Sequence, residues 1–176
     1  FVLEPEEAYA IFDASPKYSE VVFQYLRGVD FTTSPTQSPQ YWVIDFSDRS
    51  LDESEQYPIC MDTVRRRVKP YRDKVKNRRT RENWWKFERR RPELYQTIEP
   101  LSRVLFHPFT SKFLCFSFVS TDLVFAAPHV IIALTEYYHF ANLQSSLHEV
   151  WVRKYGSTLE TRMRYTASDV FETFPF

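Results

Sequence analysis

The chain has 176 residues, and its 23 Lys and Arg residues balance its 23 Asp and Glu residues, so the formal net charge is zero. Aromatic residues make up 18% of the chain, enough to build a sizeable core, and no apolar run approaches the roughly 18 residues that a membrane span requires. Only two glycines are present, Gly28 and Gly156, which excludes a glycine-rich nucleotide-binding loop.

The two cysteines and the chain ends indicate the setting of the protein. Cys60 and Cys115 are far apart in apolar contexts, which favours reduced, buried thiols over a disulfide framework. We therefore expect a soluble, cytoplasmic protein. The chain begins at Phe1 without a methionine and stops at FETFPF, and we interpret it as a single domain taken from a larger protein.

The N-terminal third predicts two short helices and one strand. Ala8, Ile11 and Phe12 keep helical spacing. A second helix is expected to start at Pro16 and to end at Gly28, because Val21, Val22, Tyr25 and Leu26 also follow helical spacing. TTSPTQSP has the composition of a loop, and YWVIDFSD predicts a strand.

Residues 54–80 predict a long helix whose apolar stripe contains Val64, Val68, Tyr71 and Val75. Pro70 is expected to kink or split it near Lys69. ENWWKFERRRPELYQTIEP predicts a loop and then a short helix from Pro92. For the adjacent tryptophans of this loop, core packing is favoured over a base-stacking platform, because neighbouring residues point in different directions.

The C-terminal half predicts strands and one further helix. SRVLFH, KFLCFSFV and LVFAAPHVIIAL have the composition of strands, and STLETRMRYT alternates as a strand. A helix over 136–155, ended by Gly156, is expected to be structural, with Phe140, Leu143, Leu147, Val150 and Trp151 at helical intervals. The predicted fold is α+β, a twisted, mostly antiparallel β core with flanking helices.

Residues 62–91 form a basic block in an otherwise acidic chain. They contain 14 Lys and Arg residues and 4 Asp and Glu residues, a net charge of +10, whereas residues 1–61 have a net charge of −8 and residues 92–176 of −2. Such a block is often a solvated face, but the planar guanidinium suits phosphate and the density favours a polyanionic partner. The candidate phosphate-binding residues are Arg65, Arg66, Lys69, Arg72, Lys76, Arg78, Arg79, Arg81 and Lys112.

Signatures of catalysis are missing from the sequence. It contains no Asn-Pro-Pro or Asp-Pro-Pro, no Asp/Glu-x-Lys, no CxxC, and Val152 stands where HExxH needs its second histidine. We therefore expect no catalytic residue and no metal site in this segment, and His148 is interpreted as a packed core histidine.

Several segments resemble, in order, one family. They are YLRGVD, SPQYWVIDF, PICMD with VRRRVKP, RENWWKF, RPELY, LQSSLHEVWVRKYGSTLETRMRY and SDVFETFPF. This succession resembles the target recognition domain of MmeI-like adenine-N6 DNA methyltransferases, found in restriction-modification and phage-defence systems. One departure is RRRP after WWKFE, where relatives often have a glycine.

The resemblance implies a DNA target recognition domain over 1–176, with the basic block at 62–91 and a C-terminal helix-strand reader at 135–176. Its partners would be double-stranded DNA and the methyltransferase domain of the same polypeptide, with no membrane. No cofactor would bind this segment. S-adenosylmethionine, with or without Mg²⁺, would serve the parent protein, which would methylate DNA with or without cutting it.

The run after Gly156 supplies candidate base-reading residues. In a strand, Glu160, Arg162 and Arg164 would point to the same side. Glu can accept a hydrogen bond from cytosine N4, and Arg can donate two to guanine O6 and N7. The resemblance implies that this pair reads one base pair. The alternatives are a surface salt bridge and a phosphate contact, and Arg164 could reach a phosphate or the next base.

Two other functions stay open at this point. The basic block could dock on an acidic protein surface, including the acidic N-terminal third of the same chain. Alternatively, an RNA-binding domain could use Trp84, Trp85 or Phe87 for stacking on unpaired bases.

Overall fold

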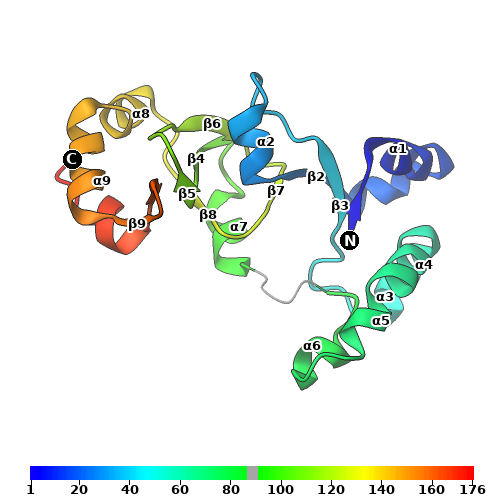
Figure 1. Ribbon diagram of the computed structural model, residues 1–176. Helices are drawn as coiled ribbons and strands as arrows, with labels where there is room; N and C mark the ends of the chain where they lie inside the picture. The colour runs from blue at the N-terminus through cyan, green and yellow to red at the C-terminus, as the bar shows by residue number, and fades with distance from the viewer. Residues whose placement is uncertain (87–90) are drawn as a thin grey trace. The chain divides into compact units, whose positions relative to one another are not determined.

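The computed structural model describes residues 1–86 and 91–176, which form two compact units. The first unit comprises Phe1–Leu26 and Ser38–Pro92, and the second comprises Arg27–Gln37 and Glu93–Phe176. Phe87 and two arginines of the basic block lie outside the described residues. Both units mix helices with strands, and the strand pairs within each unit's described part are antiparallel, so the predicted α+β class is confirmed (Figure 1).

In the first unit, the central strand β3 pairs with β1 on one side and β2 on the other, so that Val43 faces both Val2 and Phe23. The elements of this unit are β1 (Val2–Leu3), α1 (Pro5–Ala14), the 3-10 helix η1 (Pro16–Glu20), β2 (Val22–Leu26), β3 (Tyr41–Ile44), α3 (Leu51–Glu55), α4 (Pro58–Arg67), α5 (Lys69–Arg72) and α6 (Arg78–Glu82).

The predicted second helix is only partly present: it begins at Pro16 as the short 3-10 helix η1, but its second half, which carries Val22, Tyr25 and Leu26, is strand β2. The sequence VVFQY is rich in β-branched and aromatic residues, and their pairing with β3 outweighs the helical spacing. Gly28 does not end this element. It begins α2 (Gly28–Thr33) in the second unit, where an added Cβ would lie 2.7 Å from His129 Cε1.

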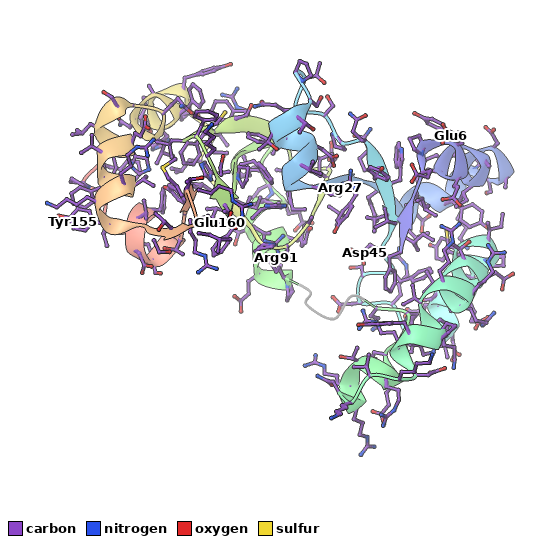
Figure 2. The ribbon with its side chains drawn as sticks, viewed as in Figure 1. Glu6, Arg27, Asp45, Arg91, Tyr155 and Glu160 are labelled. Carbon is purple, nitrogen blue, oxygen red and sulfur yellow. The ribbon has the colours of Figure 1, made fainter. Side chains whose placement is uncertain are left out.

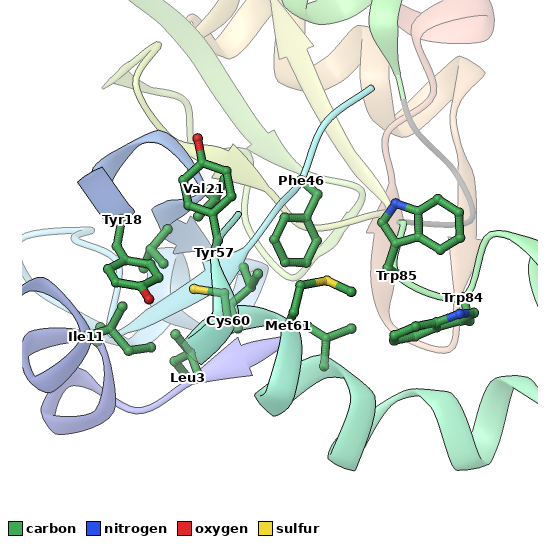
Figure 3. Packing of buried hydrophobic residues seen from close by; sticks show 14 residues of the cluster. Leu3, Ile11, Tyr18, Val21, Phe46, Tyr57, Cys60, Met61, Trp84 and Trp85 are labelled. Carbon is green, nitrogen blue, oxygen red and sulfur yellow. The ribbon is translucent and has the colours of Figure 1, made fainter. Parts of the chain in front are cut away.

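The core of the first unit packs α1, α3 and α4 against β1–β3. Figure 3 shows Trp84 and Trp85 at one end of this cluster and Leu3, Ile11 and Tyr18 at the other. Both tryptophans are only 8% exposed, and the Trp85 Nε1–H donates to the carbonyl oxygen of Arg49 at 3.2 Å. Core packing of the tryptophans is therefore confirmed, and neither offers a face for base stacking.

The predicted long helix is divided into four short ones. The chain breaks at Val68, just before Lys69-Pro70, as the proline predicts. Asn77 caps α6, its side-chain oxygen accepting from the Thr80 N–H at 3.2 Å. Tyr71 is 72% exposed, so its assignment to the apolar stripe is wrong, because the break changes the helical phase.

In the second unit, β4 is the centre of one sheet, between β6 and β8, and β10 is the centre of another, between β5 and β9. The elements of this unit after α2 are α7 (Pro92–Ile98), which begins at the last residue of the first unit, β4 (Arg103–Pro108), β5 (Thr110–Ser111), β6 (Ser117–Ser120), β7 (Val124–Phe125), β8 (His129–Ile132), α8 (Tyr137–Leu143), α9 (Ser146–Tyr155), β9 (Ser157–Leu159), β10 (Arg162–Arg164) and the π-helical turn η2 (Ala167–Phe171).

The helix predicted over 136–155 is two helices, and part of its buried face is misassigned. Ser145 starts α9, with its Oγ accepting from the His148 N–H at 3.2 Å. Leu147 is 69% exposed and Val150 is 63% exposed, whereas His148 and Val152 are buried. The break at Gln144–Ser145 shifts the phase of α9, which moves Leu147 and Val150 to the solvent side.

Gly156 ends α9, as predicted, and the reason is steric. A Cβ at this position would lie 2.6 Å from the carbonyl oxygen of Val152 and 3.3 Å from that of Arg164. Only glycine, which has no Cβ, lets the chain pass this close to both carbonyl oxygens as it runs from α9 directly into β9.

Candidate nucleic-acid interface

Residues 157–164 form a β-hairpin with a two-residue turn, not the single strand that the alternation predicts. β9 and β10 pair through Leu159 with Arg162 and Ser157 with Arg164, so Glu160 and Thr161 make the turn. Glu160, labelled in Figure 2, has a φ of 58°. Glutamate seldom adopts this left-handed conformation. The argument that residues two apart share a strand face is therefore wrong for Glu160.

Glu160 and Arg162 are nevertheless brought together. Arg162 Nη2 donates to Glu160 Oε2 at 2.8 Å, and the side chains are 46% and 73% exposed, respectively. The turn projects the carboxylate back toward the first residue of β10. The geometry is that of the surface salt bridge considered as an alternative, and it leaves both groups accessible to solvent.

Arg162 and Arg164 lie on the outer face of the sheet formed by β5, β10 and β9. Met163 between them is buried, at 4% exposure, and faces the core. The guanidinium of Arg164 lies 5.3 Å from the ring centroid of Phe109. The two arginines therefore point to the same side of the strand, as the alternation predicts.

The loop after β5 adds two residues to this region. Ser111 pairs with Met163, and Lys112 and Phe113 follow it directly. Lys112 is exposed and Phe113 is 65% exposed. We call Lys112, Phe113, Glu160, Arg162 and Arg164 the reader surface. The sequence identified its charged members but missed Phe113, which is hidden in an apolar run that resembles a strand.

A buried aromatic and histidine cluster supports the reader surface from below. Tyr165 directly follows β10, is fully buried, and its Oη lies 3.0 Å from His148 Nε2. His107 is also fully buried, and its Nδ1 lies 2.6 Å from the carbonyl oxygen of Pro108, which makes Nδ1 the donor. Burial lowers the pKa of both histidines to about 4 and raises the pKa of Tyr165. The hairpin therefore rests on groups that are neutral at pH 7, and the interpretation of His148 as a core histidine is confirmed.

In the first unit, much of the basic block is neutralised by nearby carboxylates. Arg65 pairs with Glu55 at 2.5 Å and Asp62 at 3.1 Å. Arg67 pairs with Glu7, which holds the pKa of that carboxyl below its usual range. Two further pairs are local. Arg78 pairs with Glu82 at 2.6 Å within α6, and Lys69 of α5 pairs at 2.9 Å with Asp73, the residue after that helix.

Two candidate phosphate-binding residues are held by other groups. Arg72 is only 9% exposed, and its guanidinium lies 6.0 Å from the ring centroid of Phe1, so its burial disfavours the predicted phosphate contact. Its burial involves Phe1, which is distant in the chain, so the local sequence does not reveal it. Arg81 is exposed and its Nη1 donates to the carbonyl oxygen of Val75 at 3.2 Å.

Arg66, Lys74, Lys76 and Arg79 are also exposed to solvent. None of them forms an ion pair with an acidic residue in the described part of the chain. We call them the four exposed cations. Lys74 is missing from the sequence-based candidates, although it lies in the same run.

Within 1–86 and 91–176, no group of three His, Cys, Asp or Glu side chains could hold a metal ion. None of the helices in these ranges has the length and apolar character needed to cross a bilayer.

Comparison with known proteins gives a family match and a similar solved structure. The family model described as "MmeI, target recognition domain" matches residues 1–176. Among solved structures, the chain is similar to the type IIL restriction-modification enzyme MmeI in complex with DNA, with 23% sequence identity and a TM-score of 0.78. The match covers 100% of this chain and 23% of that one. No curated protein matches the chain. The chain therefore belongs to the MmeI target recognition domain family.

Proposed function

We propose that residues 1–176 recognise a specific double-stranded DNA sequence for a restriction-modification adenine-N6 DNA methyltransferase, and position the target base for a catalytic domain elsewhere in the polypeptide. The reader surface carries this proposal, because an exposed carboxylate in the hairpin turn and exposed guanidinium groups on the adjoining strand lie together in a target recognition domain. The related MmeI structure contains DNA.

In this proposal the parent protein supplies the chemistry. Catalysis and S-adenosylmethionine, with or without Mg²⁺, belong to the methyltransferase part, and the complete protein acts in the cytoplasm. The basic block at 62–91 contacts phosphates. The reader at 135–176, together with Lys112 and Phe113, contacts the bases.

The four exposed cations contact phosphates. None of them forms an ion pair within the described residues, although Arg66 lies near enough to Glu7 to help lower the pKa of that carboxyl. Bringing phosphates near them therefore releases condensed counterions without first breaking an ion pair. Arg65, Lys69 and Arg78 contribute less, because each already has a carboxylate partner. These contacts set the register on the duplex, but they do not specify sequence.

Glu160 and Arg162 read one C·G base pair. An exposed ion pair contributes about 0–1 kcal/mol, so exchanging it for base contacts costs little. Glu160 then accepts from cytosine N4, and Arg162 donates to guanine O6 and N7. Arg164, one strand period away on the same face, contacts the next base or a phosphate.

The test is a charge exchange in the full-length protein, Glu160→Lys with Arg162→Asp, followed by mapping of methylated adenines in a host genome. We expect the methylated site to exchange C and G at one position. The matched control exchanges another exposed ion pair of the second unit, Glu149→Lys with Arg153→Asp, whose atoms lie 2.6 Å apart on α9. An unaltered site with normal activity in the first variant would exclude base reading by this pair.

The two competing functions have less support. The acidic N-terminal third does meet the basic block, since Arg67 pairs with Glu7 and Arg65 with Glu55. Because these contacts lie within the first unit, they reduce the charge available for docking an acidic partner. Stacking of RNA bases on Trp84 or Trp85 is disfavoured by the burial of both rings.

A further inference from the structure

The loop between β5 and β6 exposes one large apolar side chain, Phe113. Its ring is 65% exposed, whereas Leu114 and Phe116 in the same loop are 7% and 3% exposed. The loop thus has two anchors in the core of the second unit and one aromatic ring in solvent. Exposing Phe113 leaves a large apolar area in water, which the fold alone does not require.

The backbone around Phe113 is held in place by side-chain hydrogen bonds. The Phe113 N–H donates to Ser111 Oγ at 3.3 Å. Gln144 at the end of α8 bridges the following residues, because its Oε1 accepts from the Phe116 N–H at 2.8 Å and its Nε2 donates to the Leu114 carbonyl oxygen at 2.9 Å. A ring carried on such a fixed backbone loses little conformational entropy when it binds a partner.

The surroundings of the ring indicate the chemistry of that partner. Lys112 Nζ lies 5.3 Å from the Phe113 ring centroid, and the loop follows Ser111, the pairing partner of Met163 between Arg162 and Arg164. An exposed apolar ring next to a lysine, on the loop that leaves the strand paired with β10, matches a surface that combines negative charge with a small apolar group. The major groove of duplex DNA has this combination where thymine places its C5-methyl group beside the phosphates.

We propose that Phe113 contacts the C5-methyl group of a thymine in the base pair next to the one read by Glu160 and Arg162. Phe113 is then a specificity-determining residue, and the recognition site contains a thymine that is sensed by shape and not by hydrogen bonds. This inference rests on the proposed function.

Replacing thymine by uracil removes only the methyl group and tests the contact directly. After the site has been located by methylation mapping, binding of the full-length protein is measured on duplexes in which each thymine in turn is replaced by deoxyuridine. We expect one position at which wild-type binding weakens about fourfold, the effect of one buried methyl group. In Phe113→Ala, uracil at that position should have no further effect.

Leu147→Ala is the matched control, because Leu147 is a similarly exposed apolar residue of the same unit, at 69%. It should retain the full response to uracil, and thermal unfolding should show both variants folded. Site-specific methylation that tolerates uracil everywhere, or a Phe113→Ala variant that keeps the response, would overturn this inference alone. Absence of site-specific methylation would overturn the proposed function as well.

Discussion

The two basic regions of the molecule are built in opposite ways. In the first unit, cations are dense on short surface helices, and several are neutralised by neighbouring carboxylates. In the second unit, the cations of the reader surface are few, and two of them, Arg162 and Arg164, project from a strand whose inward side chain Met163 is buried and which leads into Tyr165, in contact with the buried His148. Phosphate contacts tolerate small displacements, whereas hydrogen bonds to base edges require fixed geometry. The comparison indicates that charge density serves affinity and a packed support serves specificity.

Acid should affect the two regions differently, and this is the largest effect that we expect. All four histidines lie in the second unit, and burial lowers the pKa of His107 and His148 to about 4. Since histidine in the unfolded chain titrates near pH 6.5, the unfolded state binds more protons between about pH 6.5 and 4. The free energy of unfolding should therefore fall as the pH falls through this range, by up to about 2.7 kcal/mol per pH unit for two protons.

Hydrogen exchange of backbone amides, corrected for intrinsic rates, can follow both units between pH 7 and pH 5. Protection should decrease in β4, β10 and α9 before it decreases in β3 and α4. The control variant His148→Gln keeps a neutral hydrogen-bonding group near Tyr165 Oη and should have a shallower pH dependence. Equal loss of protection in both units would contradict the prediction.

Removing the support of the hairpin should have the next largest effect. Met163→Ala truncates a side chain that is 4% exposed beneath the reader surface, and should lower the free energy of unfolding by about 2–5 kcal/mol. Thr158→Ala, at the exposed residue paired with Met163, should change it by less than about 0.5 kcal/mol. Thermal or denaturant unfolding measures both, and similar values for the two variants would show that Met163 is not a core residue.

The exposed cations should determine the salt dependence of DNA binding. We expect Arg66→Gln, Lys76→Gln and Arg79→Gln together to weaken binding to all duplexes about equally, and to reduce the slope of log K against log salt by about 0.9 for each lost phosphate contact. The control changes three ion-paired cations to Gln, namely Arg65, Lys69 and Arg78. This control should reduce the slope less. Titration of the full-length protein with duplex DNA at several salt concentrations gives the slopes. An unchanged slope in the first variant would assign these cations to another partner.

The sequence predicts the composition of both regions better than their geometry. The basic block and the strands at SRVLFH and YWVIDFSD follow from local pattern, and the structure contains them. The burial of Arg72 and the ion pair of Arg67 with Glu7 depend on contacts between distant segments, which no local pattern encodes. The hairpin was missed because Glu160-Thr161 contains neither Gly nor Asn, the residues that mark two-residue turns.

That atypical turn provides the smallest and most specific prediction. Glu160 has a φ of 58°, a conformation that costs a non-glycine residue roughly 1–2 kcal/mol. Glycine removes this cost, but its greater backbone entropy in the unfolded state lowers the free energy of unfolding by about 0.5–1 kcal/mol. Loss of the ion pair with Arg162 lowers the free energy of unfolding by at most about 1 kcal/mol. Glu160→Gly should therefore be nearly as stable as the wild type, or slightly more stable, while it loses recognition of one base pair.

Thr161→Gly is the matched control, because Thr161 is the other residue of the same turn and does not have a positive φ. Glycine there brings only the entropic cost, so the free energy of unfolding should fall by about 0.5–1 kcal/mol. Denaturant unfolding of the two variants, combined with methylation mapping of the full-length protein, separates stability from specificity. A residue whose removal does not weaken the fold but alters the methylated site is retained for recognition. A clear loss of stability in Glu160→Gly with an unaltered site would instead make the Glu160–Arg162 pair a structural element of the hairpin.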